Sequence, residues 1–427
     1  MVLNGLQRRL SFLCLILPVC ATVVYAQDDP PADPPAQETR ADSAEILLGE
    51  FRVFAESYNR RGRLTAADYD TLETLVERYE AYLGANEPAE RLLAAGVQLA
   101  RWLQDPAAAR RLLPHFETVD TQHPGLRIIW AEELRNAARY RRAVSVLDAI
   151  EFDLRQFPLA AALRADCLAR DNHFDDAEAT LNAIPSDLRL RSEVLGLVES
   201  VRSRITSNRE FWPEELAIRA AEAAADDLPR VEMETEHGMI ILELFENEAP
   251  NTVANFVSLA EAGFYDGTRF HRIVPGFVTQ GGDPKSRDGI TPDVGDGGPG
   301  YRIRDEVEIS QFRRHFAGSL SMAKTEAPDT GGSQFFITHT QAPHLNGVHT
   351  VFGRVIEGIE VARRMEVGDR VIAVRVVRKR DHAYQPETLP DPNATPPAAP
   401  DGGDGGDGAD GTDGGDGDGS DGDGATL

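Results

Sequence analysis

The sequence predicts a multidomain protein: an all-α helical repeat domain, then a closed antiparallel β-barrel with flanking helices, then a disordered C-terminal tail. Two changes of pattern along the 427 residues predict this order. Apolar residues recur at helical spacing up to residue 227 and at every second position from residue 231, as amphipathic helices and half-buried strands require. From residue 383 the chain is rich in Pro, then in Asp and Gly, and offers few apolar side chains to bury.

The charge of the chain argues against one class of partner. It carries 70 acidic and 44 basic residues, a formal net charge of −26 at pH 7. Phosphate binding requires a net or local excess of Lys and Arg, so we expect no nucleic-acid partner. At 41% hydrophobic residues the composition is ordinary for a globular protein, and the chain is long enough to bury more than one core.

Residues 1–26 are typical of a secretory signal peptide. Arg8 and Arg9 precede a short apolar run, and small residues stand where cleavage after Ala26 requires them. The run is shorter than the ~20 residues of a membrane-spanning helix, and no later segment is apolar enough, so we expect no membrane span in the mature chain. We therefore expect export to the periplasm or another extracytoplasmic location. A buried helix or an uncleaved anchor is the alternative.

The mature chain is expected to contain a single cysteine. Cleavage after Ala26 would remove Cys14 and Cys20 and leave Cys167, so no intramolecular disulfide can form. Cys167 lies in an apolar helical pattern, which predicts a packed core thiol rather than a reactive one.

Residues 27–40 contain four prolines and are predicted to be a disordered linker, and residues 41–227 are predicted to be the helical domain. A shift of 34 residues superposes similar side chains, namely Tyr140 on Phe174, Ala143 on Ala177, Leu147 on Leu181 and Ala131 on Ala165. Over residues 90–180 this period resembles the tetratricopeptide repeat. The resemblance implies a concave surface for a protein partner. The alternative is that the helices only space or dimerise the module that follows.

The β-rich module spans residues 229–382. It begins with an alternating pattern that turns at His237 and Gly238, which predicts a β-hairpin. A helix capped by Asn251 or Thr252 is expected next. Further short strands separated by Gly and Pro, ending in a run at residues 371–377, predict the antiparallel barrel.

Three stretches of this module are long enough to be specific. They read FHRIVPGFVTQGGD at residues 270–283, SLSMAKTEAPDTGGSQFFI at 319–337 and HLNGVHTVFG at 344–353. In this order they resemble the cyclophilin family of peptidyl-prolyl cis-trans isomerases, over residues 231–380. The resemblance implies an isomerase that rotates Xaa-Pro bonds in proline-containing polypeptides, assists protein folding and has no cofactor or metal.

The resemblance also implies roles for single residues. Arg272 matches the catalytic arginine, and Gln280 matches the glutamine that orients it. The substrate-binding matches are Phe277, Val278 (in place of the more usual Met), Phe336, Leu345 and His349 for the proline pocket, with Ala323 and Gln334 for the residues before proline. His344 stands where many eukaryotic members have Trp, a position linked to cyclosporin affinity, so weak cyclosporin binding is expected. Phe335 is expected in the core, because adjacent strand residues face opposite sides.

The chemistry of these residue types supports the assignment. Rotation about a peptide bond meets a barrier of ~18–20 kcal/mol, because the nitrogen lone pair is delocalised into the carbonyl. A cationic donor near the prolyl nitrogen stabilises the localised lone pair, and an apolar socket holds the ring while the preceding carbonyl rotates. The competing interpretation is a non-catalytic chaperone or adaptor that only binds proline segments. The presence of Arg272, Gln280 and Phe336 favours the enzyme.

Two other patterns are weaker. Seven histidines lie in the module, and five of them could suggest a metal site, namely His271, His315, His339, His344 and His349. None forms a His-x-x-His pair with a following carboxylate or Cys, so no zinc site is expected. Residues 383–427 are predicted to be a disordered tail that spaces or solubilises. Loose calcium binding is its alternative, although the bidentate Glu and the flanking helices of a calcium loop are missing.

Overall fold

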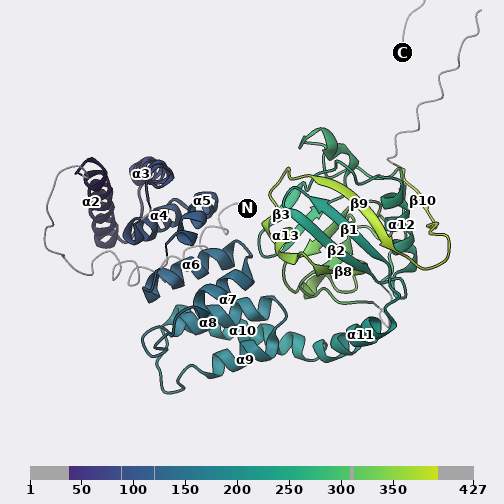
Figure 1. The fold of residues 1–427 in the computed structure, drawn as a ribbon, viewed down its shortest axis with the longest axis horizontal. Helices are drawn as coiled ribbons and strands as arrows, with labels where there is room; N and C mark the ends of the chain where they lie inside the picture. The colour runs from purple at the N-terminus through teal and green to yellow at the C-terminus, as the bar shows by residue number, and fades with distance from the viewer. Residues whose placement is uncertain (1–37, 88, 120, 308–311, 393–427) are drawn as a thin grey trace, which may run out of the picture.

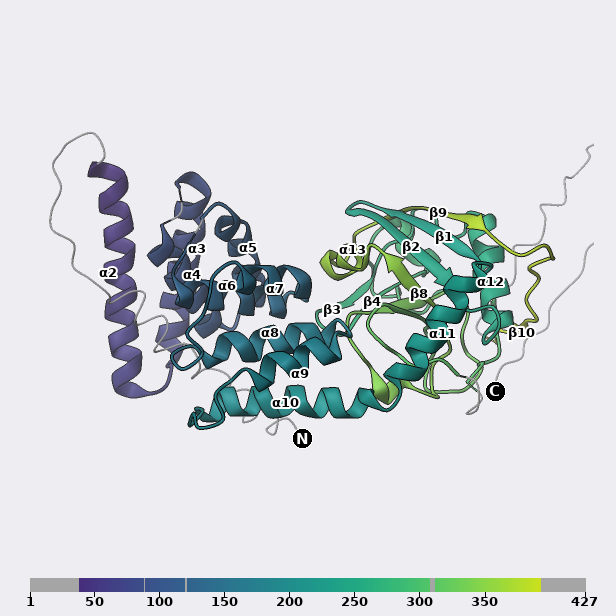
Figure 2. The same ribbon diagram turned by 60° about the horizontal axis from the view of Figure 1, so that its bottom comes forward.

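The computed structural model describes residues 38–87, 89–119, 121–307 and 312–392. The predicted signal peptide, residues 1–26, lies outside the described residues, as do positions 27–37 of the predicted linker and 393–427 of the predicted tail. A helical region, residues 38–225, precedes a sheet region, residues 230–392, and the two lie side by side (Figures 1 and 2). The predicted succession of a helical part and a β-rich part is confirmed.

Helices fill the described part of the helical region. Their bounds are α2 Glu38–Arg61, α3 Ala66–Ala85, α4 Glu90–Leu103, α5 Pro106–Glu117, α6 Pro124–Asn136, α7 Tyr140–Asp148, α8 Pro158–Arg170, α9 Phe174–Asn182, α10 Ser192–Arg209 and α11 Trp212–Ala225. Helices α4, α6, α8 and α10 begin at residues 90, 124, 158 and 192, so successive members are 34 residues apart. This is the spacing found in the sequence. Among the described residues, we find no helix with the length and apolar character needed to cross a bilayer.

Small side chains allow these helices to pack closely. Ala131, Ala143, Ala165 and Ala177 are fully buried, and they are the alanines that the 34-residue shift superposes. Close approach of neighbouring backbones gives the dense packing of a protein interior. Cys167 is buried among them in α8, and burial raises the pKa of its thiol to about 12, in keeping with the predicted packed thiol.

The sheet region is built on a curled antiparallel sheet of eight strands, in the order β3-β4-β7-β6-β8-β2-β1-β9. The strands are β1 Arg230–Thr235, β2 Gly238–Leu244, β3 Arg272–Val274, β4 Val278–Gly281, β6 Ser319–Met322, β7 Phe335–Thr338, β8 Val351–Glu357 and β9 Val371–Arg378. The predicted hairpin is confirmed, because β1 pairs with β2 and Thr235 faces Gly238. Among the described residues the end strands β3 and β9 do not pair along their length, and an isolated bridge joins Arg269 to Arg370.

Helix α12, Pro250–Glu261, covers one face of the sheet. The prediction that Asn251 or Thr252 caps this helix is wrong. Ala249 holds the cap position and Pro250 begins the helix, where its fixed φ and missing N–H carry no penalty. The N–H groups of Asn251 and Thr252 instead donate to the carboxylate of Glu306, at 3.0 and 2.8 Å. A side chain more than fifty residues away therefore replaces the local cap.

The described chain continues past the expected start of the tail at residue 383. The Tyr384 side chain is buried, and its hydroxyl donates to Glu246 Oε2 at 2.7 Å. Strand β10, Leu389–Pro390, pairs antiparallel with β5, Tyr301–Arg302. The first ten residues of the predicted tail are thus attached to the sheet region.

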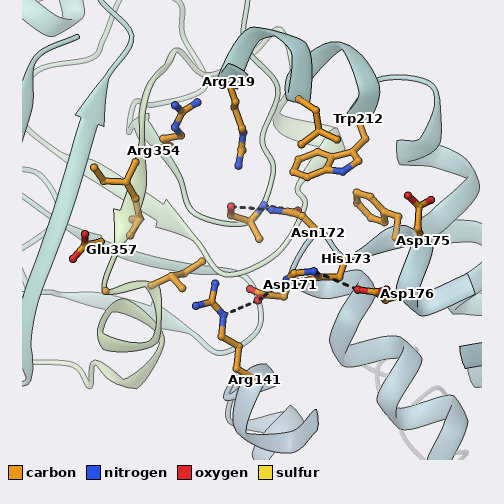
Figure 3. A pocket seen from close by; sticks show the side chains of 17 residues that line it. Arg141, Asp171, Asn172, His173, Asp175, Asp176, Trp212, Arg219, Arg354 and Glu357 are labelled. Carbon is orange, nitrogen blue, oxygen red and sulfur yellow. Dashed lines mark hydrogen bonds and ion pairs between the residues drawn. The ribbon is translucent and has the colours of Figure 1, made fainter. Parts of the chain in front are cut away.

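An interface joins the two regions, and residues of both line a pocket of about 630 Å³ that is open to solvent (Figure 3). The Trp212 ring of α11 meets Phe316 with centroids 4.9 Å apart. Asn172 exchanges two hydrogen bonds with the backbone of Ala317, at 3.1 and 3.2 Å. Helix α11 also pairs with Arg313, which lies 3.0 Å from Glu215 and 2.5 Å from Glu222. The helices therefore fix the segment 312–317 of the sheet region.

Candidate active site

The two residues predicted to be catalytic lie opposite each other on neighbouring strands of the sheet. Phe336 of the predicted proline pocket continues the same row across the sheet, and we call this row the Arg272 rung. The register of β3, β4 and β7 aligns Arg272 with Gln280, and Gln280 with Phe336. Directly opposed residues of antiparallel strands project from the same face of a sheet. Arg272, Gln280 and Phe336 therefore project to one side, although they come from three strands.

The opposite face of these strands belongs to the core. Phe335 and Ile337 are fully buried and pack in the core of the sheet region. Phe335 meets Phe256 of α12 edge-on, with centroids 5.7 Å apart. The expectation that Phe335 is a core residue is confirmed. Its neighbour Phe336 projects from the opposite face of the sheet.

Phe336 lies between two histidine rings. His315 stacks on it with centroids 5.9 Å apart and planes 10° apart, and His349 meets it edge-on at 5.5 Å. His349 is held in turn, because its Nδ1 lies 3.1 Å from the Met322 carbonyl oxygen and its backbone N–H donates to Leu345 O at 3.1 Å. The structure thus brings together Phe336, His349 and Leu345, which are predicted to form the apolar socket for a proline ring.

Phe277 and His344 form the rim of this socket. Their rings stack with centroids 5.4 Å apart. His344 lies in the short helix η3, Pro343–Leu345, and is exposed, whereas Phe277 is half-buried in the turn between β3 and β4. Val278 is only 2% exposed and opposes Val274 and Thr338 in neighbouring strands. It lies beneath the rim rather than at its surface.

Arg272 is a cation exposed at the edge of the apolar socket. Its Nη1 lies 3.5 Å from Gln280 Oε1, the outer limit of a hydrogen bond. Gln280 Nε2 donates to Gln334 Oε1 at 3.1 Å, which leaves the Gln280 oxygen directed at Arg272. No carboxylate among the described residues forms an ion pair with Arg272. The guanidinium is therefore oriented by a neutral amide and keeps its charge available for a bound peptide.

Gln334 links this pair to the predicted surface for residues before proline. Its backbone carbonyl accepts a hydrogen bond from Ala323 N–H at 2.9 Å. Its side-chain Nε2 donates to the carbonyl oxygens of Gly295 and Gly297, at 2.7 and 2.9 Å. A groove of about 870 Å³ runs beside Gln280, Ala323 and Gln334. An extended peptide can lie there with its proline at the socket.

Two residues that support this site have no assigned role in the sequence analysis. Asp283 is fully buried and accepts hydrogen bonds from the N–H groups of Gly295 and Gly297, at 2.6 and 2.9 Å. A Cβ at Gly297 would lie 2.0 Å from Asp283 Oδ1, so only glycine fits. The sequence signal for this role is the pair Asp283-Pro284, because an Asp before a turn often accepts hydrogen bonds from backbone N–H groups of the turn.

His315 is the second such residue, because the sequence singles it out only as a potential zinc ligand. Its ring nitrogens lie 3.0 Å from Asn346 Oδ1 and 2.9 Å from Ser321 Oγ. Burial lowers its pKa to about 4, so the ring that supports Phe336 is neutral at physiological pH. Its place against Phe336 depends on tertiary packing, and no local sequence signal reveals it.

Acidification is expected to destabilise the sheet region through its buried histidines. Burial lowers the pKa of His315 to about 4 and that of His339 to about 3, whereas an unfolded histidine titrates near 6.5. Below pH 6.5 the unfolded state therefore binds protons that the folded state does not. As the pH is lowered from ~6.5 to ~4, the free energy of unfolding should fall by roughly 1.4 kcal/mol per pH unit for each histidine. Above pH ~6.5 these two histidines should not make the free energy of unfolding depend on pH.

Urea unfolding at pH 7.5, 6, 5 and 4.5 measures this slope. His315→Gln should reduce the slope by the share of one histidine, whatever it does to the absolute stability. An unchanged slope in that variant would show that His315 does not carry the effect.

Known proteins match the sheet region. The family model described as cyclophilin type peptidyl-prolyl cis-trans isomerase/CLD matches residues 230–381. A peptidyl-prolyl cis-trans isomerase of Synechococcus elongatus is 50% identical over 147 residues, which are 34% of this chain and 94% of the relative. Peptidyl-prolyl cis-trans isomerase B of Bacillus subtilis is 55% identical over 137 residues, 32% of this chain and 90% of the relative. A solved cyclophilin type isomerase of Cryptosporidium parvum is 30% identical and covers 36% of this chain and 99% of its own, with a TM-score of 0.32.

The chain covers nearly the whole length of the two bacterial relatives, and the family model spans the residues of the Arg272 rung. Their identity of 50% and 55% to this region shows that the chain belongs to the cyclophilin family, and that residues 230–381 are its peptidyl-prolyl cis-trans isomerase domain.

Proposed function

We propose that the protein is exported and accelerates cis-trans isomerisation of Xaa-Pro bonds in proteins outside the cytoplasm, and so assists their folding. The isomerase activity follows from the family. The rung of Arg272, Gln280 and Phe336 is the observation that carries its assignment to these residues. Export rests on the signal-peptide pattern of residues 1–26. Proline isomerisation takes tens of seconds or more without catalysis, which makes it a slow step that a folding protein gains from accelerating.

The proposed mechanism needs no covalent step. A peptide lies along the groove with its proline ring between Phe336, His349 and Leu345. The carbonyl before proline then rotates while the ring stays fixed. As the lone pair localises on the prolyl nitrogen, the Arg272 guanidinium donates a hydrogen bond to it. This interaction strengthens in the twisted state, so it lowers the barrier rather than merely holding the substrate.

We propose further that the helical region forms repeats of the tetratricopeptide type, and that the curled sheet closes into a barrel. The 34-residue spacing of α4, α6, α8 and α10 supports the first proposal. The bridge between Arg269 and Arg370 supports the second. Stacked helix pairs expose a continuous surface to one side, and we propose that this surface binds a protein partner or an unfolded client.

One comparison tests both activities. The full mature chain and residues 229–392 are assayed on an Ala-Pro peptide and on an unfolded protein whose folding is limited by proline isomerisation. A larger advantage of the full chain on the unfolded protein than on the peptide would support client binding by the helices. The same ratio of rates on both substrates would contradict it, and no isomerisation of the peptide by either protein would contradict the enzyme. Export is tested separately: a mature N-terminus at Gln27 in the extracytoplasmic fraction is expected, and an intact N-terminus in the cytosol would contradict it.

Cyclosporin is expected to bind weakly, and His344→Trp is expected to tighten binding by about tenfold or more. An indole at the rim buries more apolar area than an imidazole and adds an N–H donor, and about 1.4 kcal/mol is sufficient for tenfold. Calorimetric titration measures the affinity. His173→Trp, at an exposed position of the helical region, is the control and should change nothing. Equal affinity of the unchanged chain and His344→Trp would contradict the assignment of this position.

A further inference from the structure

The last described strand of the chain is attached at the rim of the substrate groove. β10 pairs with β5, with Leu389 opposite Arg302 and Pro390 opposite Tyr301. Asp391 then forms an ion pair with Arg302 at 2.8 Å, and both side chains are about three-quarters buried. Asn251 fixes the approach to this strand, because it accepts a hydrogen bond from Glu387 N–H at 2.7 Å and donates one to Glu387 O at 3.1 Å. The chain is therefore held on both sides of β10.

Asp391 and Gln280, the residue that orients Arg272, line the same groove. The groove of about 870 Å³ has Gln280, Ala323 and Gln334 at one part of its wall and Arg302 with Asp391 at another. The described chain thus reaches the wall of this groove at Asp391, one residue before its described end at Pro392.

The direction of β10 carries the chain toward the catalytic residues. In an antiparallel pair, a chain that advances from Leu389 to Pro390 moves from Arg302 back toward Tyr301. The residues that precede Tyr301 are the loop 295–300, which also lines the groove and bonds to Gln334. A segment that continues in this direction passes the surface implied for residues before proline and arrives at the socket in the N-to-C direction of a substrate.

The sequence that follows contains suitable bonds. Residues 393–400 read NATPPAAP and include Thr395-Pro396 and Ala399-Pro400. Pro396 lies five residues and Pro400 nine residues beyond Asp391, roughly 17 and 30 Å of extended chain. The run of Asp and Gly begins only after these prolines.

We propose that residues 393–400 are an intramolecular substrate that occupies the groove of the same molecule and places a Xaa-Pro bond at Arg272. The tail then competes with other proline-containing polypeptides. A short tether gives an effective concentration in the mM range, so even a weak site is occupied for much of the time. The inference rests on the isomerase activity and not on export or on client binding by the helices.

The first test is kinetic and uses an Ala-Pro peptide with three forms of the mature chain. Ending the chain at Pro392, which keeps Asp391, should raise kcat/KM about two- to tenfold, because a tethered competitor at mM effective concentration is removed. The rise should come from a lower KM with unchanged kcat. The full chain with Pro396→Ala, Pro397→Ala and Pro400→Ala should show the same rise. A chain that ends at Pro400, which keeps the prolines and loses the acidic run, should behave like the full chain.

Unchanged kcat/KM in the three-proline variant would overturn the proposal, as would a full rise in the chain that ends at Pro400. A rise that grows with protein concentration would also overturn it, because it would mean that the tail acts between molecules. Failure of the proposal leaves the truncated chain active on the peptide, whereas failure of the isomerase assignment would leave every form inactive.

The second test observes the tail directly. Cis-trans exchange of the Thr395-Pro396 and Ala399-Pro400 bonds is followed by NMR in the full chain, and at least one of them should exchange far faster than the uncatalysed tens of seconds. Arg272→Ala should return that bond to the uncatalysed rate. Slow exchange of both bonds in the unaltered chain would overturn the proposal.

Discussion

Replacing Arg272 by alanine is expected to lower kcat/KM on an Ala-Pro peptide by about 10- to 150-fold, since one charge-assisted hydrogen bond is worth about 1.5–3 kcal/mol and each 1.36 kcal/mol is tenfold in rate. The fall should appear mainly in kcat, because the bond to the prolyl nitrogen forms only as the peptide twists. The side chain is exposed and the described residues give it no ion-pair partner, so its removal leaves no buried charge. The free energy of unfolding should therefore change by less than about 0.5 kcal/mol.

Arg375→Ala is a matched control for this variant. Arg375 is also an exposed strand arginine, and its ion-pair partner within the described chain is the exposed Glu234, at 3.2 Å. The control should keep full activity, and the loss of a surface ion pair should cost at most about 1 kcal/mol. Activity of Arg272→Ala equal to that of the control would show that the guanidinium does not act in the twisted state.

Contiguous motifs made the catalytic face predictable from the sequence. FHRIVPGFVTQGGD contains Arg272, Phe277 and Gln280 within nine consecutive residues, so a resemblance to a family identifies them together. Alternation along β7 then separates Phe335 from Phe336 without any tertiary information. Hydrophobic periodicity likewise predicted the helical region, and the 34-residue shift found in the sequence equals the distance between the starts of α6 and α8.

The supporting contacts were not predictable in the same way. Glu306 replaces a local cap of α12 across more than fifty residues, and His315 reaches Phe336 only when two strands and a loop have come together. The bonds between Asn172 and Ala317 join residues 145 positions apart in different regions. Such pairs depend on how two folded parts dock, and neither composition nor period contains that information. The bonds between Asn172 and Ala317 also connect the helical region to the segment that carries His315.

The second large effect is expected at this junction, where Arg313→Met should cost about 3 kcal/mol of stability. Arg313 is 3% exposed, stacks over Phe245 with its guanidinium carbon 3.8 Å from the ring centroid, and pairs with Glu215 and Glu222. Removing one partner of a buried ion pair typically costs about 3–5 kcal/mol, because the other charge is left uncompensated. Arg219 and Arg354 still contact these carboxylates at 2.7 and 2.6 Å, which places the loss at the lower end of that range.

This loss should also reach the active site, because Arg313 begins the segment that holds His315 against Phe336. Urea unfolding gives the stability, and hydrogen exchange at the Ala317 amide, which donates to Asn172 at 3.1 Å, reports the junction locally. Exchange at Ala317 should accelerate in Arg313→Met and stay slow in Arg375→Met, whose exposed ion pair is worth at most about 1 kcal/mol. A several-fold fall in kcat/KM should accompany it, since His315 supports the proline socket through the same segment. Faster exchange with unchanged kcat/KM would mean that the helices stabilise the isomerase domain without positioning its pocket. Slow exchange at Ala317 together with a stability loss below about 1 kcal/mol would show that the buried ion pairs of Arg313 do not hold the two regions together.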